Sequence, residues 1–329
     1  MEKLLEVKNL KKYFPVPVGY LHAVDDVSFT INKGETLGVV GESGCGKSTL
    51  GRAILRLHEP TSGEVLYDGM DILHFKEDEM RFMRQKMQII FQDPYASLNP
   101  RMTIAQIIEE PLKIHKTYKS DAQRRAKVEE IMELVGLKKR NFNSYPHEFD
   151  GGRRQRVVIG RSLAINPQFI VCDEPVSALD VSVQAQILNL LMKLQSKMGL
   201  TYMFISHDLS VVKHISDNIG VMYLGQMIEK APKREIFSQP LHPYTLALLS
   251  AIPSINVDQK YKKIILKGEI TSPINPKTGC RFAARCPFAA DKCLCETPEL
   301  KEVTKAHFVA CHRYEEIMNK TLNYDTINN

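Results

Sequence analysis

The stretch Gly41-Glu42-Ser43-Gly44-Cys45-Gly46-Lys47-Ser48-Thr49 decides the fold of this chain. It follows an apolar run, Thr36 to Val40, that predicts a buried strand, and it leads into a helical segment that begins near Lys47. Strand, glycine-rich loop and helix are the context in which the pattern G-x-x-x-x-G-K-S binds phosphate. The glycines let backbone N–H groups turn toward an anion, and the helix N-terminus adds partial positive charge. A glycine-rich turn with a surface lysine is the less favoured alternative.

This loop predicts a site for a nucleoside triphosphate. Lys47 is placed to reach the β- and γ-phosphates, and the Ser48 hydroxyl to ligate Mg²⁺. A second apolar run, Phe169 to Cys172, ends in the two carboxylates Asp173 and Glu174. Beside a phosphate loop, Asp173 is expected to support Mg²⁺, and Glu174 to orient or deprotonate the attacking water. A solvated turn is the alternative explanation for two adjacent acids.

Length and composition limit the number of domains, the cellular location and the kind of partner that the chain can have. The 329 residues predict one large domain with an appendage, or two domains. No apolar run approaches the roughly 18 residues of a membrane span, and the N-terminus lacks the long apolar core of a secretion signal, so a cytoplasmic protein is expected. The net charge of +6 is spread among acidic neighbours and gives little support for a nucleic-acid partner.

Hydrophobic periodicity predicts an α/β chain with a helical insertion. Strands are expected at Leu4 to Val7, Val24 to Ile31, Val65 to Tyr67, Met87 to Phe91 and Tyr202 to Ser206, and an irregular segment at Lys12 to Pro15. From Pro94 onward the pattern is helical: Ile104, Ile107 and Ile108 share one face, Val128, Ile131 and Val135 another, and Ser120 with Gln123 forms a capping box. We therefore predict an inserted helical subdomain over about residues 94–165, and past Pro253 the periodicity weakens.

Further segments match, in order, those of ATP-binding cassette (ABC) ATPases, and the chain resembles this family over roughly residues 1 to 235. The resemblance implies that Tyr13 stacks on adenine and that residues 41–49 hold the phosphates. It implies that Gln92, in the Q-loop, contacts Mg²⁺ and senses a membrane domain, and that His207 contacts the γ-phosphate. Ser177-Ala178-Leu179-Asp180 matches the D-loop at the dimer interface. The implied catalytic residues are Glu174, His207 and Gln92, and the implied Mg²⁺ ligands are Ser48, Gln92 and Asp173.

Finer details resemble the ATP-binding subunits of dipeptide and oligopeptide importers. Gln92 to Pro100 is similar to their Q-loop, and Leu241-His242-Pro243-Tyr244-Thr245 to the segment after their core. Gly279-Cys280-Arg281 and Arg285-Cys286-Pro287 are similar to parts of their C-terminal domain. The resemblance therefore predicts an ABC domain at residues 1–238 and a small cysteine-rich domain at 239–329.

The signature segment departs from the family pattern. The family has Ser where this chain has Asp150, and Gln where it has Arg153; Gly151 and Gly152 match. In an ABC dimer this motif faces the partner subunit's ATP, and two like charges about 4 Å apart repel by about 4 kcal/mol at an effective dielectric near 20. We expect the composite site that uses this signature to be impaired, while Arg153 offsets part of the repulsion. A tolerated variation or an engineered change is the alternative.

Five of the seven cysteines crowd the C-terminal part of the chain. In a reducing compartment this crowding indicates a metal or cluster rather than disulfides. The spacing of Cys280, Cys286, Cys293 and Cys311 lacks the C-x-x-C pairs of zinc sites and differs from the common ferredoxin run, so it leaves the metal open. The resemblance to peptide importers implies a 4Fe-4S cluster on these four residues, with zinc or plain thiols as alternatives and Cys295 as the spare.

The phosphate loop predicts a site for ATP, and the resemblance to peptide importers implies a subunit that hydrolyses Mg-ATP at a dimer interface and drives peptide import. The implied partners are a second ABC ATPase subunit, with a heterodimer favoured by the altered signature, two membrane permeases and, indirectly, an extracytoplasmic peptide-binding protein. The chain is then expected at the cytoplasmic face of the membrane. A regulatory subunit that binds ATP without turnover, and a soluble ABC ATPase unlinked to transport, are the alternatives. The transported solute is left open.

Overall fold

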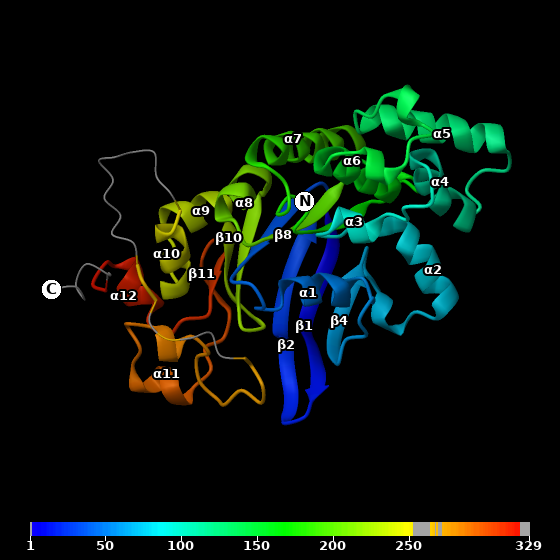
Figure 1. The fold of residues 1–329 in the computed structure, drawn as a ribbon. Coiled ribbons are helices and arrows are strands. Elements are labelled where there is room, and N and C mark those ends of the chain that lie inside the picture. Colours follow the sequence, from blue (N-terminus) through cyan, green and yellow to red (C-terminus); the bar gives the residue numbers. More distant parts are fainter. Residues whose placement is uncertain (1, 253–263, 267, 269–271, 323–329) are drawn as a thin grey trace. The chain divides into compact units, whose positions relative to one another are not determined.

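The computed structural model of the chain describes residues 2–252, 264–266, 268 and 272–322. These residues form two compact units, each built from several stretches of sequence. Figure 1 shows the helices and strands along the chain. The first unit comprises Met1–Leu4, Ile31–Thr36 and His74–Ile205. The second comprises Leu5–Thr30, Leu37–Leu73 and Ser206–Asn329. The predicted boundary between residues 238 and 239 stays a prediction.

The first unit combines a parallel sheet with a set of helices. Its strands β6 (Met87–Ile90), β7 (Phe169–Asp173) and β8 (Thr201–Ser206) run parallel in that order. Every residue of β7 and β8 is buried, as in parallel sheets covered on both faces. Its helices are α2 (Glu77–Lys86), α3 (Pro94–Ser97), α4 (Ile104–Ile114), α5 (Asp121–Leu134), α6 (Gly151–Leu163) and α7 (Val181–Met198).

Helices α4, α5 and α6 pack on one another (Figure 1). The predicted apolar faces are confirmed, because all six residues named for them are buried: Ile104, Ile107, Ile108, Val128, Ile131 and Val135. The predicted capping box is confirmed as well. Ser120 Oγ accepts a hydrogen bond from Gln123 N at 3.3 Å, and Gln123 Oε1 accepts one from Ser120 N at 3.4 Å.

The second unit contains a sheet in the order β2-β1-β4-β5, formed by β1 (Lys3–Val16), β2 (Gly19–Asn32), β4 (Ser62–Tyr67) and β5 (Met70–Asp71). The prediction of an irregular segment at residues 12–15 is wrong, because these residues lie in β1. Thr61 holds this part of β1 extended: its amide donates to Lys11 O at 2.7 Å, and its hydroxyl accepts from Tyr13 N at 2.9 Å.

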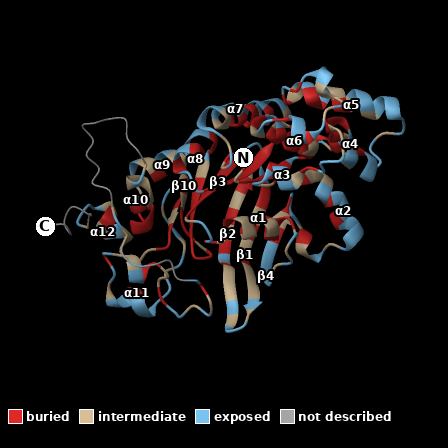
Figure 2. Cartoon of the chain, viewed as in Figure 1, coloured by how far each residue is buried: buried red, intermediate tan, exposed pale blue. Residues whose placement is uncertain are grey.

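A further run of strands in the second unit begins with β3 (Thr36–Val40), which is buried throughout, as predicted (Figure 2). It pairs in parallel with β9 (Asn218–Tyr223), and the antiparallel strands β10 (Gln226–Pro232), β12 (His307–Val309) and β11 (Lys301–Thr304) follow. The helices are α1 (Lys47–Ile54), α8 (Leu209–Ile215), α9 (Lys233–Ser238), α10 (Pro243–Ser250), α11 (Asp291–Cys295) and α12 (Tyr314–Met318).

A fully buried carboxylate links three elements of the second unit. Glu229, on β10, accepts hydrogen bonds from the backbone amides of Leu241 at 2.7 Å and His242 at 3.0 Å, at the start of α10. It also pairs with His307 Nε2, on β12, at 2.8 Å. A buried charge needs such partners, so this residue fixes α10 and β12 to β10.

Candidate functional site

The predicted phosphate loop joins β3 to α1 as a strand–loop–helix unit. Lys47 is 4% exposed, and its amine donates hydrogen bonds to Gly41 O at 2.8 Å and Glu42 O at 2.9 Å. The ammonium is therefore held against the loop that its own sequence predicts to bind phosphate. Gly46 precedes α1 without a side-chain cap, which leaves the first backbone N–H groups of the helix to bind an anion.

Two glycines of the loop are required by its backbone. Gly46 has φ of 104°, and a Cβ there would lie 2.0 Å from Ala23 O. Gly44 has φ of 80°, a conformation that side chains rarely adopt. Ser43 and Gly44 are exposed, Cys45 is buried, and Glu42, Ser48 and Thr49 are half-buried. The loop thus has a fixed backbone with one open side.

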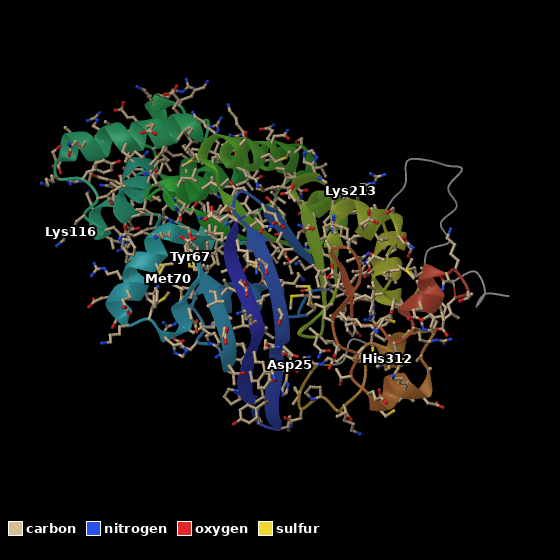
Figure 3. The ribbon with its side chains drawn as sticks, turned by 180° about the vertical axis from the view of Figure 1, so that it is seen from behind. Asp25, Tyr67, Met70, Lys116, Lys213 and His312 are labelled. Atoms are coloured by element: carbon tan, nitrogen blue, oxygen red, sulfur yellow. The ribbon has the colours of Figure 1, made fainter. Side chains whose placement is uncertain are left out.

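Tyr13, the residue predicted to stack on adenine, is held by side chains of β2. Its ring stacks on the ring of His22 with centroids 3.8 Å apart, and its hydroxyl donates to Asp25. Asp25, labelled in Figure 3, also pairs with His22 at 3.1 Å and with Arg281. Burial alone would raise the pKa of Asp25, but the hydrogen bonds from Tyr13 and His22 and the charge of Arg281 outweigh it and lower that pKa.

The first unit brings together the predicted Q-loop glutamine and the predicted catalytic acid. Asp173 ends β7 and is 2% exposed, and Glu174 follows it. Gln92 Nε2 donates to Glu174 Oε2 at 3.2 Å. Glu174 has φ of 48°, uncommon for a residue with a side chain, and its amide donates to Ile205 O at 3.0 Å. Strained backbone of this kind persists where the surroundings enforce it, often at functional sites.

The predicted D-loop packs on the predicted signature segment. Ser177 Oγ donates to Glu174 O at 3.1 Å, so the first residue of the D-loop is hydrogen-bonded to the backbone of Glu174. Leu179 lies so close to Gly151 that a Cβ there would be 3.0 Å from its side chain, and Val183 lies similarly close to Gly152. Asp180 precedes α7, where its carbonyl accepts from Gln184 N at 2.8 Å.

Asp150 caps helix α6 with its carboxylate. Its Oδ1 accepts from Arg153 N at 2.8 Å, and its Oδ2 lies 3.4 Å from Arg153 Nε. Asp and Ser are equally good N-caps, so the departure from the family pattern leaves the helix capped while placing a negative charge at its N-terminus. Arg153 pairs with that carboxylate and so offsets part of its charge.

His207 follows β8 and belongs to the second unit, where its side chain is exposed. The predicted Mg²⁺ residues are divided: Ser48 belongs to the second unit, and Gln92 and Asp173 to the first. The structure therefore leaves the Mg²⁺ set a prediction.

The four predicted cluster cysteines line one pocket of the second unit, together with Phe282 and Phe288. Cys295 is exposed, and its thiol donates to Asp291 O. Burial raises the pKa of Cys286 and Cys311 to about 12. Among the described residues, however, no group of His, Cys, Asp or Glu side chains is arranged to hold a metal ion. The arrangement of these side chains therefore does not support the prediction of an iron–sulfur cluster or of zinc.

Two arginines beside these cysteines were missed as site residues by the sequence reasoning. Arg285 Nη1 and Nη2 donate to the two carboxylate oxygens of Glu42, in the phosphate loop, at 2.8 and 3.1 Å. Arg281 pairs with Asp25 and donates to Leu224 O. The sequence places both arginines next to cysteines, but this position does not reveal that their carboxylate partners, Asp25 and Glu42, lie more than 200 residues away in the chain.

Comparisons with known proteins place this fold and loop in a family. The family model described as "ABC transporter" matches residues 24–177, and "Oligopeptide/dipeptide transporter, C-terminal region" matches residues 228–293. The chain is 53% identical to the oligopeptide transport ATP-binding protein AppF of Bacillus subtilis (strain 168), over 95% of this chain and 98% of that protein. It is 50% identical to the dipeptide transport ATP-binding protein DppF of Escherichia coli (strain K12), over 97% and 96%.

Solved structures agree. The dimeric post-hydrolysis structure of the ATP-binding cassette MJ0796 bound to ADP and Pi has a TM-score of 0.64 at 31% identity and covers 70% of this chain and 99% of that one. The structure of cbiO1 from Clostridium perfringens, part of the transporter complex cbiONQ, has a TM-score of 0.65 at 26% identity, over 73% and 92%.

The chain belongs to the ABC transporter ATPases, and its α/β fold is that of their nucleotide-binding domain. Within them it belongs with the oligopeptide and dipeptide transport ATP-binding proteins, whose C-terminal region it carries. Among the described residues, no helix is both long and apolar enough to cross a membrane.

Proposed function

We propose that this chain hydrolyses ATP to power the import of dipeptides or oligopeptides through partner permease subunits. The observation that carries the proposal is the buried amine of Lys47, which lies 2.8 Å from Gly41 O at the start of α1. The chain that carries this lysine is 50% to 53% identical in sequence to peptide transport ATP-binding proteins. The C-terminal match over residues 228–293 favours peptides over other solutes.

We assign the phosphates to the loop of residues 41–49, with Lys47 at the β- and γ-phosphates, and the adenine to Tyr13. Ser48, Gln92 and Asp173 would hold Mg²⁺, which supplies charge neutralisation on the phosphates. The uncapped N-terminus of α1 and the glycine-only backbone at Gly46 support this assignment, because both keep N–H groups open to an anion.

For hydrolysis we assign Glu174 as the base that takes a proton from the attacking water. The hydrogen bond from Gln92 supports this role, because it orients the carboxylate at the end of β7. His207 would contact the γ-phosphate, as the family resemblance implies. Its place directly after β8, with an exposed side chain, leaves it accessible to a ligand.

We propose a dimer in which the signature, Asp150 to Arg153, faces the ATP of a second ABC subunit. The capping carboxylate of Asp150 supports the view that the composite site completed by this chain is impaired, because it puts negative charge where phosphate oxygens would bind. This favours a heterodimer, since a partner with an intact signature would complete the site that uses Lys47 and Glu174.

Restoring the family signature tests this asymmetry. The double variant Asp150→Ser with Arg153→Gln should raise the ATPase rate of the assembled complex at least about threefold, because it removes a repulsion of the order of kilocalories while keeping an N-cap. The rate is measured as phosphate release from the complex in lipid vesicles. Unchanged turnover in the double variant would show that Asp150 does no harm.

The proposed partners are two membrane permeases and a peptide-binding protein outside the membrane, with this chain at the cytoplasmic face. A direct test is uptake of a labelled tripeptide by cells in which the chain is deleted and then restored. Uptake should disappear on deletion and return with the wild-type chain. Loss of uptake of an unrelated solute, with peptide uptake intact, would refute peptide import.

We further propose that Cys280, Cys286, Cys293 and Cys311 hold a 4Fe-4S cluster. Their place on the lining of one pocket supports it, since four cysteine thiolates are the usual ligands of such a cluster. If bound, the cluster supplies a structural cross-link or a redox sensor. Hydrolysis itself transfers no electrons.

Iron content settles the identity of the group. The chain purified without oxygen should absorb near 400 nm and contain about four irons, and Cys293→Ser should lose both, while Cys295→Ser should keep both. A colourless preparation containing one zinc, or neither metal, would overturn the cluster.

The alternative of a regulatory subunit that binds ATP without turnover is favoured by one observation, the acidic cap Asp150. The pairing of Gln92 with Glu174 favours hydrolysis instead.

A further inference from the structure

The C-terminal cysteine segment contacts the nucleotide site through two arginines. Arg281 directly follows Cys280, and Arg285 directly precedes Cys286. Their side chains are 8% and 9% exposed. Arg281 forms an ion pair with Asp25, which lies beside Tyr13, and Arg285 forms one with Glu42 of the phosphate loop.

Arg285 neutralises the one acid of the phosphate loop. Its guanidinium makes a two-bond pair with Glu42 at 2.8 and 3.1 Å and also donates to Tyr223 Oη at 3.3 Å. The Glu42 amide donates to Tyr244 Oη at 2.9 Å, and Tyr223 and Tyr244 pack on Phe282. Glu42 is thus fixed at both its backbone and its carboxylate by residues at or beyond position 223.

Arg281 acts on the other end of the site. It pairs with Asp25, the acceptor of the Tyr13 hydroxyl, and donates to Leu224 O. The next residue, Gly225, donates to Cys45 O at 2.8 Å and accepts from Asp25 N at 2.8 Å. Arg281 therefore holds Tyr13 through Asp25, and also the turn that joins the phosphate loop to β2.

We propose that Arg281 and Arg285 are positioning residues for the nucleotide: Arg281 for the base, through Tyr13, and Arg285 for the phosphates, by neutralising Glu42. The proposal rests on the proposed nucleotide site. Without Arg285, the Glu42 carboxylate would face a triphosphate with its charge uncompensated, and like charges at short range repel. Without Arg281, Asp25 loses its cationic partner, and the Tyr13 ring loses the support that orients it.

The two roles predict different responses to two ligands. Inorganic tripolyphosphate has no base, so it reports on the phosphate loop alone, whereas ATP reports on both parts. Arg285→Gln should weaken the binding of Mg-ATP and of Mg-tripolyphosphate by the same factor, about 10-fold, because the uncompensated Glu42 carboxylate repels the phosphates of both ligands. Arg281→Gln should weaken Mg-ATP about 10-fold and leave Mg-tripolyphosphate within about twofold of the wild type.

Three further variants separate positioning from general stability. Adding Glu42→Gln to Arg285→Gln should restore affinity to within about threefold of the wild type, because the unpaired negative charge is gone. Asp25→Asn should reproduce the loss specific to ATP. Arg234→Gln, which removes an exposed arginine of the same unit, is the matched control and should leave both affinities unchanged.

The measurement is isothermal titration of the full-length chain with each ligand, with thermal unfolding to confirm that each variant folds. If both arginine variants bind the two ligands as the wild type does, or if Glu42→Gln fails to rescue Arg285→Gln, the positioning role is refuted while the proposed function stands. If the wild type binds neither ligand, the proposed function fails, and this inference fails with it.

Discussion

Replacement of Lys47 by alanine is expected to weaken Mg-ATP binding at least about 100-fold and to abolish measurable ATPase activity. The reason is the setting of the amine, which is 4% exposed and bonded to Gly41 O and Glu42 O. Because these bonds are made inside the loop, the ammonium is already desolvated and oriented before a nucleotide arrives. Its removal takes away a cation that would make strong charge-assisted bonds to two phosphates.

The comparison is made by titration with Mg-ATP and by phosphate release, with Lys8→Ala as the matched control. Lys8 lies in the same unit, on β1, and its amine makes solvent-accessible ion pairs with Glu6 and Glu64 at 3.2 and 3.5 Å, of the kind that contributes little. It should bind and hydrolyse ATP as the wild type does. Equal affinities for Lys47→Ala and the wild type would remove the basis of the nucleotide site.

Replacement of Glu174 by glutamine is expected to separate binding from chemistry. Glutamine has the shape of glutamate and can still pair with Gln92, so Mg-ATP affinity should stay within about threefold of the wild type. It cannot accept the proton of the attacking water, and loss of a general base typically costs 100-fold to 10,000-fold in rate, so turnover should fall by at least about 100-fold.

Single-turnover hydrolysis of bound ATP measures this step without product release. Glu130→Gln, an exposed acid on α5 paired with Lys127, is the control and should leave the rate unchanged. A wild-type rate in Glu174→Gln would assign the base elsewhere. A large loss of ATP affinity would instead show that Glu174 acts in binding.

The structural features that the sequence predicts correctly are those encoded in consecutive residues, whereas the roles of the site residues stay predictions. The phosphate loop is one such stretch, since strand, glycines, lysine and helix follow each other directly. The helix faces of α4 and α5 were predictable for the same reason, because helical periodicity is local. The ABC fold followed from the order of several short motifs, and the comparisons confirm it.

What the sequence missed depends on partners far along the chain. Residues 12–15 look irregular by composition, yet the bonds from Thr61 make them part of a strand. Strands β11 and β12 have only four and three residues, too few for a periodic pattern. Strand β12 pairs with the edge of β10, and β11 pairs in turn with β12. The arginine contacts with Asp25 and Glu42 span more than 240 residues, and no local rule predicts them.

The buried pair of Glu229 with His307 limits where this protein can be truncated or fused to a related subunit. If the chain is truncated between Leu241 and His307, the Glu229 carboxylate loses its imidazole partner and β10 loses its pairing with β12. An unpaired strand edge promotes aggregation. Hybrids made with a related subunit must therefore exchange β10, α10 and β12 as one matched block. In this respect strand β12 of the C-terminal region is part of the same compact unit as β10.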